Sequence, residues 1–311
     1  MFKVLISDSM SNVAQKIFEK HNIETEIKTG LSEDEIVKII SEYDALIVRS
    51  ATKVTKNIII AGKKLKVIGR AGAGVDNIDV VNAKEKNILA MNTPGGNTNA
   101  TAEHTLALIL SLLRKVPYSN DTTHQGKWEK KNIKGTELSN KTLGIVGFGN
   151  VAIRLSNLVK GFNMNILAYS KSLASRQKEF PDIKNVSFDE LITTSDIISF
   201  HCKAPPDGKP LINKEYYKKM KPTTVIINTA RGNIVEENDL NNALNNNMIA
   251  GAALDVYSKE PAKENILFNN PKVILTPHIA ASTAEAQIIV AEMIANQICN
   301  FLLKGVKINT L

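Results

Sequence analysis

The stretch Thr142-Leu-Gly-Ile-Val-Gly147-Phe-Gly149-Asn150-Val151-Ala152 decides the fold. A β-prone run, 142–146, leads into two glycines and an alanine with the spacing G-x-G-x-x-A, and a helical pattern follows. Gly147 permits a tight turn, Gly149 lets the backbone approach a pyrophosphate, and the small Ala152 lets the helix pack closely on the strand. The first N–H groups of that helix can bind the phosphates. The stretch therefore predicts a dinucleotide-binding unit, with a tight turn that binds no cofactor as the alternative.

Short β-prone runs alternate with longer amphipathic runs on both sides of this stretch. Strands separated by helical crossovers are typical of parallel sheets that are covered on both faces. The downstream runs complete a six-stranded Rossmann-type sheet with 165–169, 196–200, 223–227, 249–253 and 272–275, and the upstream strands are 2–7, 45–48, 65–68 and 87–90. The sequence thus predicts an α/β protein with two doubly wound parallel-sheet domains.

Two long helical patterns indicate how the domains are connected. The pattern 99–115 is apolar enough to cover a domain junction or a subunit interface. The pattern 283–303 is long enough to leave the second domain and pack back on the first. We therefore expect a discontinuous first domain, 1–98 with 284–311, around a dinucleotide-binding domain, 99–283.

The composition is that of an ordinary globular protein. The chain has 311 residues, 43% of them hydrophobic, and its net charge of +8 is spread along the sequence. Such a surface suits the attraction of anionic small molecules better than the binding of nucleic acid. No apolar stretch reaches the ~18 residues of a membrane span, and the start, MFKVLISDSM, lacks a signal-peptide pattern. Cys202 and Cys299 are too few for a disulfide framework or a metal site. We expect a cytoplasmic protein with no metal and no nucleic-acid or membrane partner.

The end of the second strand of the dinucleotide unit departs from the usual pattern. An acidic residue there normally binds the adenine-ribose hydroxyls of NAD. Here 165–169 is followed by Ser170-Lys171-Ser172, and the next carboxylate is Glu179. A neutral hydroxyl beside an ammonium group does not repel a 2′-phosphate. We assign Ser170 and Lys171 to the ribose end of the cofactor and expect NAD with NADP tolerated; a drifted site that still prefers NAD is the alternative.

Polar residues follow three further strands of the same domain, where the ligands of such sheets bind. Arg231, Glu260 and His278 come after the runs 223–227, 249–253 and 272–275. His278 can exchange the proton of a hydroxyl, Glu260 can stabilise its imidazolium, and Arg231 can hold a carboxylate and polarise a carbonyl. Each of these residue types, taken singly, is more often structural. His201 also ends a strand and stays open, whereas His104 is interpreted as a surface or packing residue.

With these features the sequence resembles the D-2-hydroxyacid dehydrogenase family over essentially its whole length, and most of all the D-3-phosphoglycerate dehydrogenases within it. The motifs that carry the resemblance are Val48-Arg49-Ser50-Ala51-Thr52-Lys53-Val54-Thr55, Gly69-Arg-Ala-Gly-Ala-Gly-Val-Asp-Asn77, Met91-Asn-Thr-Pro-Gly-Gly-Asn97, Gly126-Lys-Trp128-Glu-Lys130, Gly-Thr-Glu-Leu at 135–138, the Gly147 turn, Thr229-Ala-Arg231-Gly, Ala253-Leu-Asp255-Val and Pro277-His278-Ile-Ala-Ala-Ser-Thr283.

The resemblance implies which residues form the site. Arg231, Glu260 and His278 would be the catalytic set. The cofactor would be bound by residues of the glycine turn and of the strand ends, namely Gly147, Gly149, Asn150, Val151, Ser170, Lys171, Cys202, Thr229, Ala230, Asp255, Ala280 and Ala281.

The first domain would be a flavodoxin-like substrate domain. Its Arg49 and Arg70 match residues that grip the substrate phosphate in such enzymes. Lys130, beside Trp128, matches a basic position that reaches the site of the neighbouring subunit, which implies a homodimer.

Three departures from the family pattern stand out. Ser170 replaces the usual acid, and Ala73 replaces a hydroxyl residue that is often found in the loop near the cofactor. The chain also ends at Leu311, whereas long members carry further C-terminal domains, one of which binds serine. We expect no serine feedback through such a domain.

The function that the resemblance implies is hydride transfer between C2 of 3-phosphoglycerate and a nicotinamide cofactor, giving 3-phosphohydroxypyruvate, the first step of serine biosynthesis. An NADPH-dependent hydroxypyruvate or glyoxylate reductase is the alternative within the enzyme class. A nucleotide-sensing, corepressor-like binding module is the alternative from another class, because a fold does not fix a function.

Overall fold

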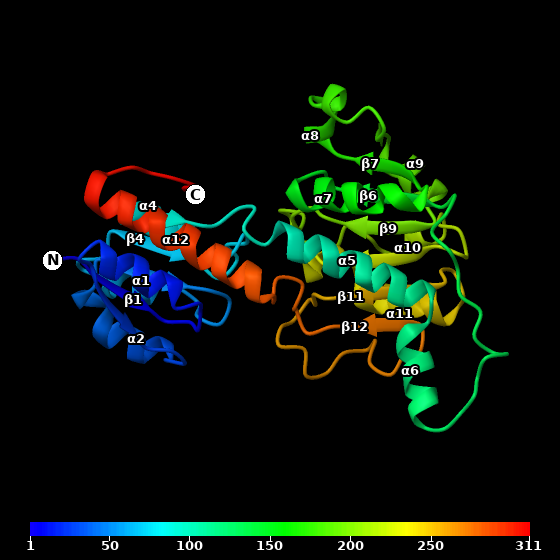
Figure 1. Cartoon of the computed structure of the whole chain (residues 1–311), viewed down its shortest axis with the longest axis horizontal. Coiled ribbons are helices and arrows are strands. Elements are labelled where there is room, and N and C mark those ends of the chain that lie inside the picture. Colours follow the sequence, from blue (N-terminus) through cyan, green and yellow to red (C-terminus); the bar gives the residue numbers. More distant parts are fainter. The chain divides into compact units, whose positions relative to one another are not determined.

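Two parallel β-sheets, each with helices on both faces, organise the chain (Figure 1). The computed structural model describes all 311 residues, Met1–Leu311. These residues divide into unit 1, which comprises Met1–Asn97 and Ala281–Leu311, and unit 2, which comprises Thr98–Ala280. The predicted fold class, α/β with two doubly wound parallel sheets, is confirmed.

Unit 1 contains a five-stranded sheet in the order β2-β1-β3-β4-β5, which is the flavodoxin-like order. All of its neighbouring strands are parallel. The sequence does not predict β2, because this edge strand reads Glu-Thr-Glu-Ile and lacks the apolar run of a buried strand. The strands are β1 (Lys3–Ile6), β2 (Glu24–Ile27), β3 (Ala45–Val48), β4 (Val67–Arg70) and β5 (Leu89–Met91).

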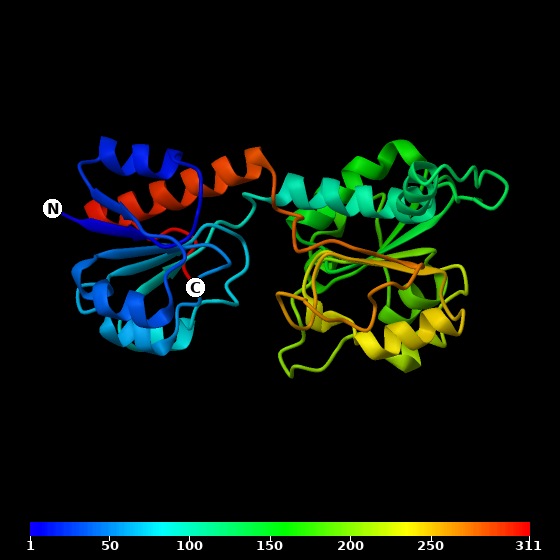
Figure 2. The same ribbon diagram turned by 90° about the horizontal axis from the view of Figure 1, so that it is seen from below.

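Helices cover the two faces of this sheet with separate cores (Figure 2). Phe18 of α1 and Ile294 of α12 pack on one face, and Ile36 of α2 and Ile58 of α3 pack on the other. The helices of unit 1 are α1 (Val13–Lys20), α2 (Glu33–Ile39), α3 (Lys56–Ala61), α4 (Val80–Glu85) and α12 (Ala284–Lys304), with a 3₁₀ turn at Ile40–Glu42.

The last helix, α12, returns to unit 1 and lies directly on β4. A Cβ atom on Gly69 would be 2.7 Å from side-chain atoms of both Ile294 and Ile298, so only glycine allows this close approach. The Thr283 hydroxyl accepts from the Ala286 N–H at 3.1 Å and caps the first turn. By length and composition α12 is the one helix able to cross a membrane, but half of its apolar window is buried inside the structure. This burial is what a core helix shows.

Unit 2 contains a seven-stranded parallel sheet in the order β12-β11-β10-β9-β6-β7-β8. Counted from β6 this is the dinucleotide-binding order 3-2-1-4-5-6 with one strand added. The prediction of six strands is wrong because it misses β8. This strand has only two residues, too few to show a pattern in the sequence. The strands are β6 (Thr142–Val146), β7 (Asn165–Tyr169), β8 (Lys184–Asn185), β9 (Ile197–Phe200), β10 (Val225–Asn228), β11 (Gly251–Leu254) and β12 (Val273–Leu275).

The helices of unit 2 also form two layers. Leu108 and Ile109 of α5 share a core with Leu155 of α7, so α5 buries its apolar side against the sheet of its own unit. Leu191 of α9 and Leu240 of α11 belong to the core on the other face. The helices are α5 (Thr98–Leu113), α6 (Val116–His124), α7 (Asn150–Leu158), α8 (Lys171–Ala174), α9 (Phe188–Thr194), α10 (Lys214–Tyr217) and α11 (Glu237–Asn245), with 3₁₀ turns at Val159–Phe162, Gln177–Glu179 and Gly232–Ile234.

Candidate active site

The glycine turn between β6 and α7 has the geometry that its spacing predicts. Gly147 has φ of 87°, and a Cβ there would lie 2.8 Å from the His201 carbonyl oxygen and 2.9 Å from Cys202 Cα, so only glycine fits. Gly149, the residue that precedes α7, has no atom within 4 Å of the position that a Cβ would take. Ala152 is fully buried against the sheet. The backbone at Gly149 is therefore open to a ligand while the helix packs tightly behind it.

The start of α7 fits a pyrophosphate. No side chain caps its first turn, although the first N–H groups of a helix need partners from outside the helix. Asn150 is exposed and Val151 is half-buried at this position. A dinucleotide phosphate would satisfy these donors and meet the positive end of the helix dipole.

The end of β7 carries hydroxyl groups rather than an acid. The Ser170 N–H donates to Asn185 Oδ1 at 3.2 Å, and the Ser170 and Ser172 hydroxyls are 2.9 Å apart. The Ser172 hydroxyl in turn donates to the Phe148 carbonyl, inside the glycine turn, at 3.2 Å. The exposed Lys171 begins α8. The serine pair thus borders the glycine turn, where the ribose end of a dinucleotide would lie.

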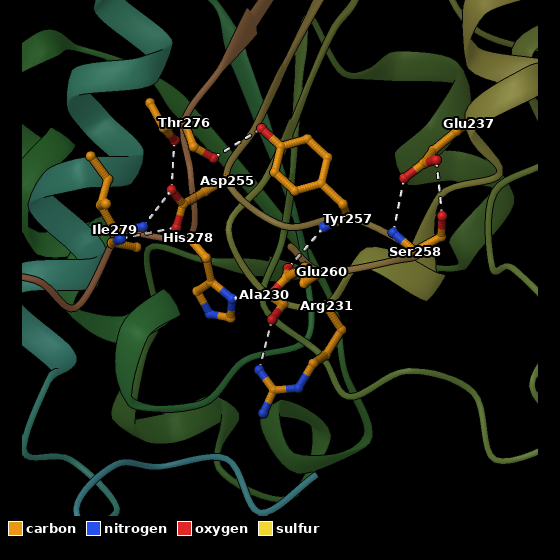
Figure 3. A network of polar contacts seen from close by, with 11 residues as sticks. Ala230, Arg231, Glu237, Asp255, Tyr257, Ser258, Glu260, Thr276, His278 and Ile279 are labelled. Atoms are coloured by element: carbon orange, nitrogen blue, oxygen red, sulfur yellow. Dashed lines mark hydrogen bonds and ion pairs between the residues drawn. The ribbon is translucent and has the colours of Figure 1, made fainter. Parts of the chain in front are cut away.

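Three neighbouring strand ends bring Glu260 and His278 together beside Arg231 (Figure 3). Arg231 follows β10, Glu260 lies in the loop after β11, and His278 follows β12. The His278 Nδ1 atom is 2.6 Å from Glu260 Oε2. Because a carboxylate accepts the Nδ1 proton, the lone pair of the neutral ring is on Nε2, which is then the nitrogen that can take a proton.

The contact between Glu260 and His278 shifts their two pKa values in opposite directions. The hydrogen bond to Glu260 raises the pKa of His278 above its usual value, although burial and the charge of Arg231 oppose the shift. Burial works against the ionisation of Glu260, but hydrogen bonds from His278 and from the Tyr257 N–H outweigh it and lower the Glu260 pKa. The pair therefore consists of an ionised carboxylate and an imidazole that binds a proton more readily than a free one.

Asp255 holds the turn that carries His278. It is fully buried, and its Oδ1 accepts from the Thr276 hydroxyl at 2.6 Å and from the Ile279 N–H at 2.9 Å. Its Oδ2 accepts from the Ala280 N–H at 2.9 Å. His278 itself has φ of 54°, a left-handed backbone conformation that residues other than glycine adopt only at a cost in free energy. The carboxylate thus fixes a backbone conformation that the sequence alone does not favour.

Two further residues contact this turn, and sequence reasoning missed both. His104 of α5 is half-buried and packs against the turn: its Nε2 is 3.2 Å from Thr276 Oγ1 and 3.4 Å from Asp255 Oδ1. The Tyr257 hydroxyl donates to the Thr276 carbonyl at 2.9 Å. Both lie far from residue 276 in sequence, so no local motif indicates the contact.

The segment after β10 is held from both sides. The Asn228 side chain donates to the Arg231 carbonyl at 2.9 Å and accepts from the Ala230 N–H at 3.1 Å. The Thr229 hydroxyl is 2.8 Å from the Thr105 hydroxyl of α5. This segment presents Arg231 in a defined position.

The assigned Cys202 and the neighbouring His201, whose role the sequence left open, have environments that keep both side chains uncharged. Burial lowers the pKa of His201 to about 4, and its Nε2 is 2.9 Å from the Ser199 hydroxyl, so the ring is neutral near pH 7. Burial raises the pKa of the Cys202 thiol to about 11. A neutral imidazole and an un-ionised thiol therefore lie beneath the glycine turn.

Unit 1 brings Arg49 and Arg70 together at the ends of β3 and β4. The Arg70 Nε donates to the Arg49 carbonyl at 3.2 Å. The buried Asp8 accepts from the Arg49 N–H at 2.5 Å, and the Arg49 guanidinium donates to the Ser9 carbonyl at 2.9 Å and to Gln287 Oε1 at 3.4 Å. Two guanidinium groups at adjacent strand ends suit an anion that carries more than one charge.

Two other assigned residues are not joined to the group around His278. Lys130 is exposed and lies next to Trp128, which is 84% exposed. Ala281 is half-buried and belongs to unit 1 by its contacts. The roles assigned to the residues of this site stay predictions.

The chain matches the family model described as "D-isomer specific 2-hydroxyacid dehydrogenase, NAD binding domain" over residues 106–280. It is 43% identical over 307 residues to the D-3-phosphoglycerate dehydrogenase of Archaeoglobus fulgidus, and the aligned region covers 98% of this chain and 58% of that protein. It is 42% identical over 290 residues to the hydroxypyruvate reductase of Thermotoga maritima, which covers 92% of this chain and 94% of that protein. The chain therefore spans little more than half the length of the curated D-3-phosphoglycerate dehydrogenases that it matches.

Solved structures give the same result. The NAD⁺-bound 3-phosphoglycerate dehydrogenase of Entamoeba histolytica superposes with a TM-score of 0.85 at 29% identity, over 100% of this chain and 98% of that one. A structure titled acyclic imino acid reductase in complex with NADPH and D-Arg superposes with a TM-score of 0.89 at 28% identity, over the full length of both chains. The resemblance seen in the sequence is confirmed: the chain belongs to the D-isomer specific 2-hydroxyacid dehydrogenases, and residues 106–280 form the NAD-binding domain of that family.

Proposed function

We propose that the protein is a D-3-phosphoglycerate dehydrogenase, which oxidises C2 of 3-phosphoglycerate to the ketone of 3-phosphohydroxypyruvate, the first step of serine biosynthesis. The observation that carries the proposal is the 2.6 Å contact of Glu260 with His278 beside Arg231, in a domain built to bind NAD. The curated D-3-phosphoglycerate dehydrogenases that match at 40–46% identity support this choice of substrate.

The side chains at the strand ends divide the chemistry between them. When bound, NAD supplies the acceptor for the hydride that leaves C2. His278 Nε2 removes the proton of the C2 hydroxyl, and the Glu260 carboxylate stabilises the imidazolium that results. Arg231 binds the substrate carboxylate and draws electron density from the oxygen that becomes the carbonyl. General base catalysis of this kind contributes about 10²–10⁴-fold to a rate.

Arg49 and Arg70 supply the preference for a phosphorylated substrate. A phosphate dianion offers several acceptors to two guanidinium groups, whereas the hydroxymethyl group of glycerate or hydroxypyruvate offers none of comparable strength. The buried Asp8 fixes the backbone of Arg49, which supports a preorganised anion site.

One observation favours a second candidate, an NADPH-dependent hydroxypyruvate or glyoxylate reductase. Ser170 and Ser172 place hydroxyls where an acid would exclude a 2′-phosphate. The Thermotoga maritima hydroxypyruvate reductase also matches this chain over nearly its full length. This candidate differs from the first in its substrate and its cofactor but not in the roles of His278, Glu260 and Arg231.

The test is a steady-state assay that compares 3-phosphoglycerate with glycerate for the parent chain and for Arg49→Ala. Losing hydrogen bonds to a charged group costs about 1.5–3 kcal/mol each, so kcat/KM for 3-phosphoglycerate should fall by roughly 10–150-fold while glycerate is little affected. Lys53→Ala is the matched control, because Lys53 is an exposed cation in the same loop. Equal losses on both substrates, or a parent that prefers glycerate, would favour the second candidate. His278→Ala should abolish turnover of both.

We further propose a cytoplasmic homodimer that acts on small molecules and binds neither nucleic acid nor membranes. Exposed apolar side chains at Val116, Tyr118 and Trp128 support an interface in this part of unit 2. Lys130, two residues after Trp128, would then reach the neighbouring subunit. The free thiols Cys202 and Cys299 suit a reducing compartment. Sedimentation of the parent and of Trp128→Ala tests the dimer, which should dissociate in the variant.

A further inference from the structure

The loop that carries Glu260 is fastened to the first residue of α11. Glu237 Oε1 accepts from the Ser258 N–H at 2.9 Å (Figure 3). Glu237 Oε2 accepts from the Ser258 hydroxyl at 2.9 Å and from the Asn265 side-chain amide at 2.9 Å. One carboxylate therefore ties together two points of the loop, and Glu260 lies between them in sequence.

We call the hydrogen bonds of Glu237 to Ser258 and Asn265 the clamp. At its Ser258 end, the adjacent residue Tyr257 contacts Glu260. The neighbouring Tyr257 N–H donates to Glu260 Oε1 at 3.0 Å, and Glu260 Oε2 is the oxygen that meets His278. Holding Ser258 in place thus holds the N–H that orients the Glu260 carboxylate. The Asn265 end also serves the loop itself, because Asn265 Oδ1 accepts from the Leu267 N–H at 2.9 Å.

Glu237 is also linked to Arg231, by a short stretch of chain. Only the 3₁₀ turn Gly232–Ile234 and two more residues separate them. A Cβ on Gly232 would lie 1.8 Å from the Tyr257 carbonyl oxygen and 2.6 Å from the Ser258 nitrogen, so this segment and the Glu260 loop are in direct backbone contact. The stretch 231–237 therefore presents Arg231 at one end and grips the Glu260 loop at the other.

We propose that Glu237 is a positioning residue that fixes Glu260 relative to both His278 and Arg231. Its carboxylate hydrogen-bonds to Ser258 and Asn265, and it acts on Glu260 through the backbone of Tyr257 and Ser258. Small displacements of an orienting group reduce rates strongly, by as much as 10²-fold for an ångström. The importance of this positioning for turnover rests on the proposed function, whereas the positioning itself does not.

The decisive variant is Glu237→Gln, with Glu236→Gln as its matched control. Glutamine has nearly the same shape, but its amide group turns a donor toward Ser258 or Asn265 where an acceptor is required. Glu236 is the preceding carboxylate; it caps α11 and hydrogen-bonds within that helix, accepting from the Asp239 N–H at 2.5 Å and from the Asn238 side-chain amide at 3.0 Å. Both variants remove one negative charge from the start of the same helix.

Two measurements separate positioning from a general structural effect. The first is the pKa of the His278 imidazole, followed by NMR in the cofactor-free chain; Glu260 raises this pKa, with Asp255 acting in the same direction and Arg231 in the other. The second is kcat against KM. Glu237→Gln should lower the His278 pKa and reduce kcat by about 10–100-fold with KM for NAD unchanged, and Glu236→Gln should leave both within twofold of the parent.

A third variant keeps the test sharp if Glu237→Gln folds poorly. Ser258→Ala removes one donor of the clamp and should change the same two quantities in the same direction, but less. A parent-like His278 pKa and kcat in Glu237→Gln would overturn the proposal, as would equal effects of the two glutamine variants. A lowered His278 pKa in a chain that oxidises no 2-hydroxy acid would support the positioning role while the proposed function fails.

Discussion

Replacing Asp255 with Asn should destabilise the NAD-binding domain by about 3–5 kcal/mol with almost no change in volume. The carboxylate is fully buried and accepts three hydrogen bonds from the turn at 276–280. An asparagine amide accepts at one end only. In its better orientation it keeps the bonds from Thr276 and Ile279 and turns an NH₂ group toward the Ala280 N–H.

The magnitude follows from these three bonds. A buried N–H without an acceptor costs about 1–3 kcal/mol, and each of the other two bonds changes from a charge-assisted to a neutral one, at about 1 kcal/mol each. For a domain of 150–250 residues, each kcal/mol lowers Tm by about 2–4 °C, so Tm should fall by roughly 6–20 °C.

The assay is thermal unfolding of the cofactor-free chain at pH 7, followed by calorimetry. Asp182→Asn is the control, because Asp182 is exposed in the same domain. Burial opposes the ionisation of Asp255, but its hydrogen bonds lower its folded-state pKa below the ordinary 3.8. The stability contributed by the ionised Asp255 is therefore fully present above pH 3.8 and is lost as the pH falls through the folded-state pKa. The difference in Tm between the parent and Asp255→Asn should then shrink in acid. A Tm within about 2 °C of the control would refute this account of the turn.

Two further outcomes test the charges of the site. Glu260→Gln should lower the pKa of His278, because the main cause of its raised value is removed; since oxidation needs the neutral base, the rising limb of the kcat/KM profile should move to lower pH, and an unmoved limb would contradict the pairing. Ser170→Asp should produce a clear preference for NADH over NADPH, whereas the parent should accept both; a parent that already excludes NADPH by more than ~10³-fold, about 4 kcal/mol, would show that this strand end does not set the preference.

The strands that the sequence predicts well are those with uninterrupted apolar runs. The ranges 45–48, 142–146 and 165–169 agree with β3, β6 and β7 residue for residue. The edge strands β2 and β8 escape prediction, because a half-exposed edge needs no apolar run and a two-residue strand has no period. The three strands predicted residue for residue all lie inside a sheet, whereas the two that the sequence misses lie at an edge.

The candidate site divides along a similar line. That Arg231, Glu260 and His278 follow strands could be predicted, since the carboxyl ends of parallel strands meet at one edge. The residues that hold the Glu260 loop could not be predicted. Glu237 and Asn265, for example, are 28 residues apart in sequence, and only tertiary packing brings them together. Residues that touch a ligand are found by motif, and residues that hold them are found only in the folded chain.

The division of unit 1 into two segments has a consequence for biosynthesis. The sheet face that α12 covers is lined by Val4, Ile6 and Ile47, which are buried together with Ile294 and Ile298. A ribosome makes the first five strands early and α12 only after the whole of unit 2, and at about 5–20 residues per second this takes roughly 10–40 s. During that interval α1 covers this face without its partner α12, so apolar residues of the sheet stay exposed on the nascent chain until unit 2 is complete. Such transiently exposed apolar surface promotes aggregation and binding to chaperones.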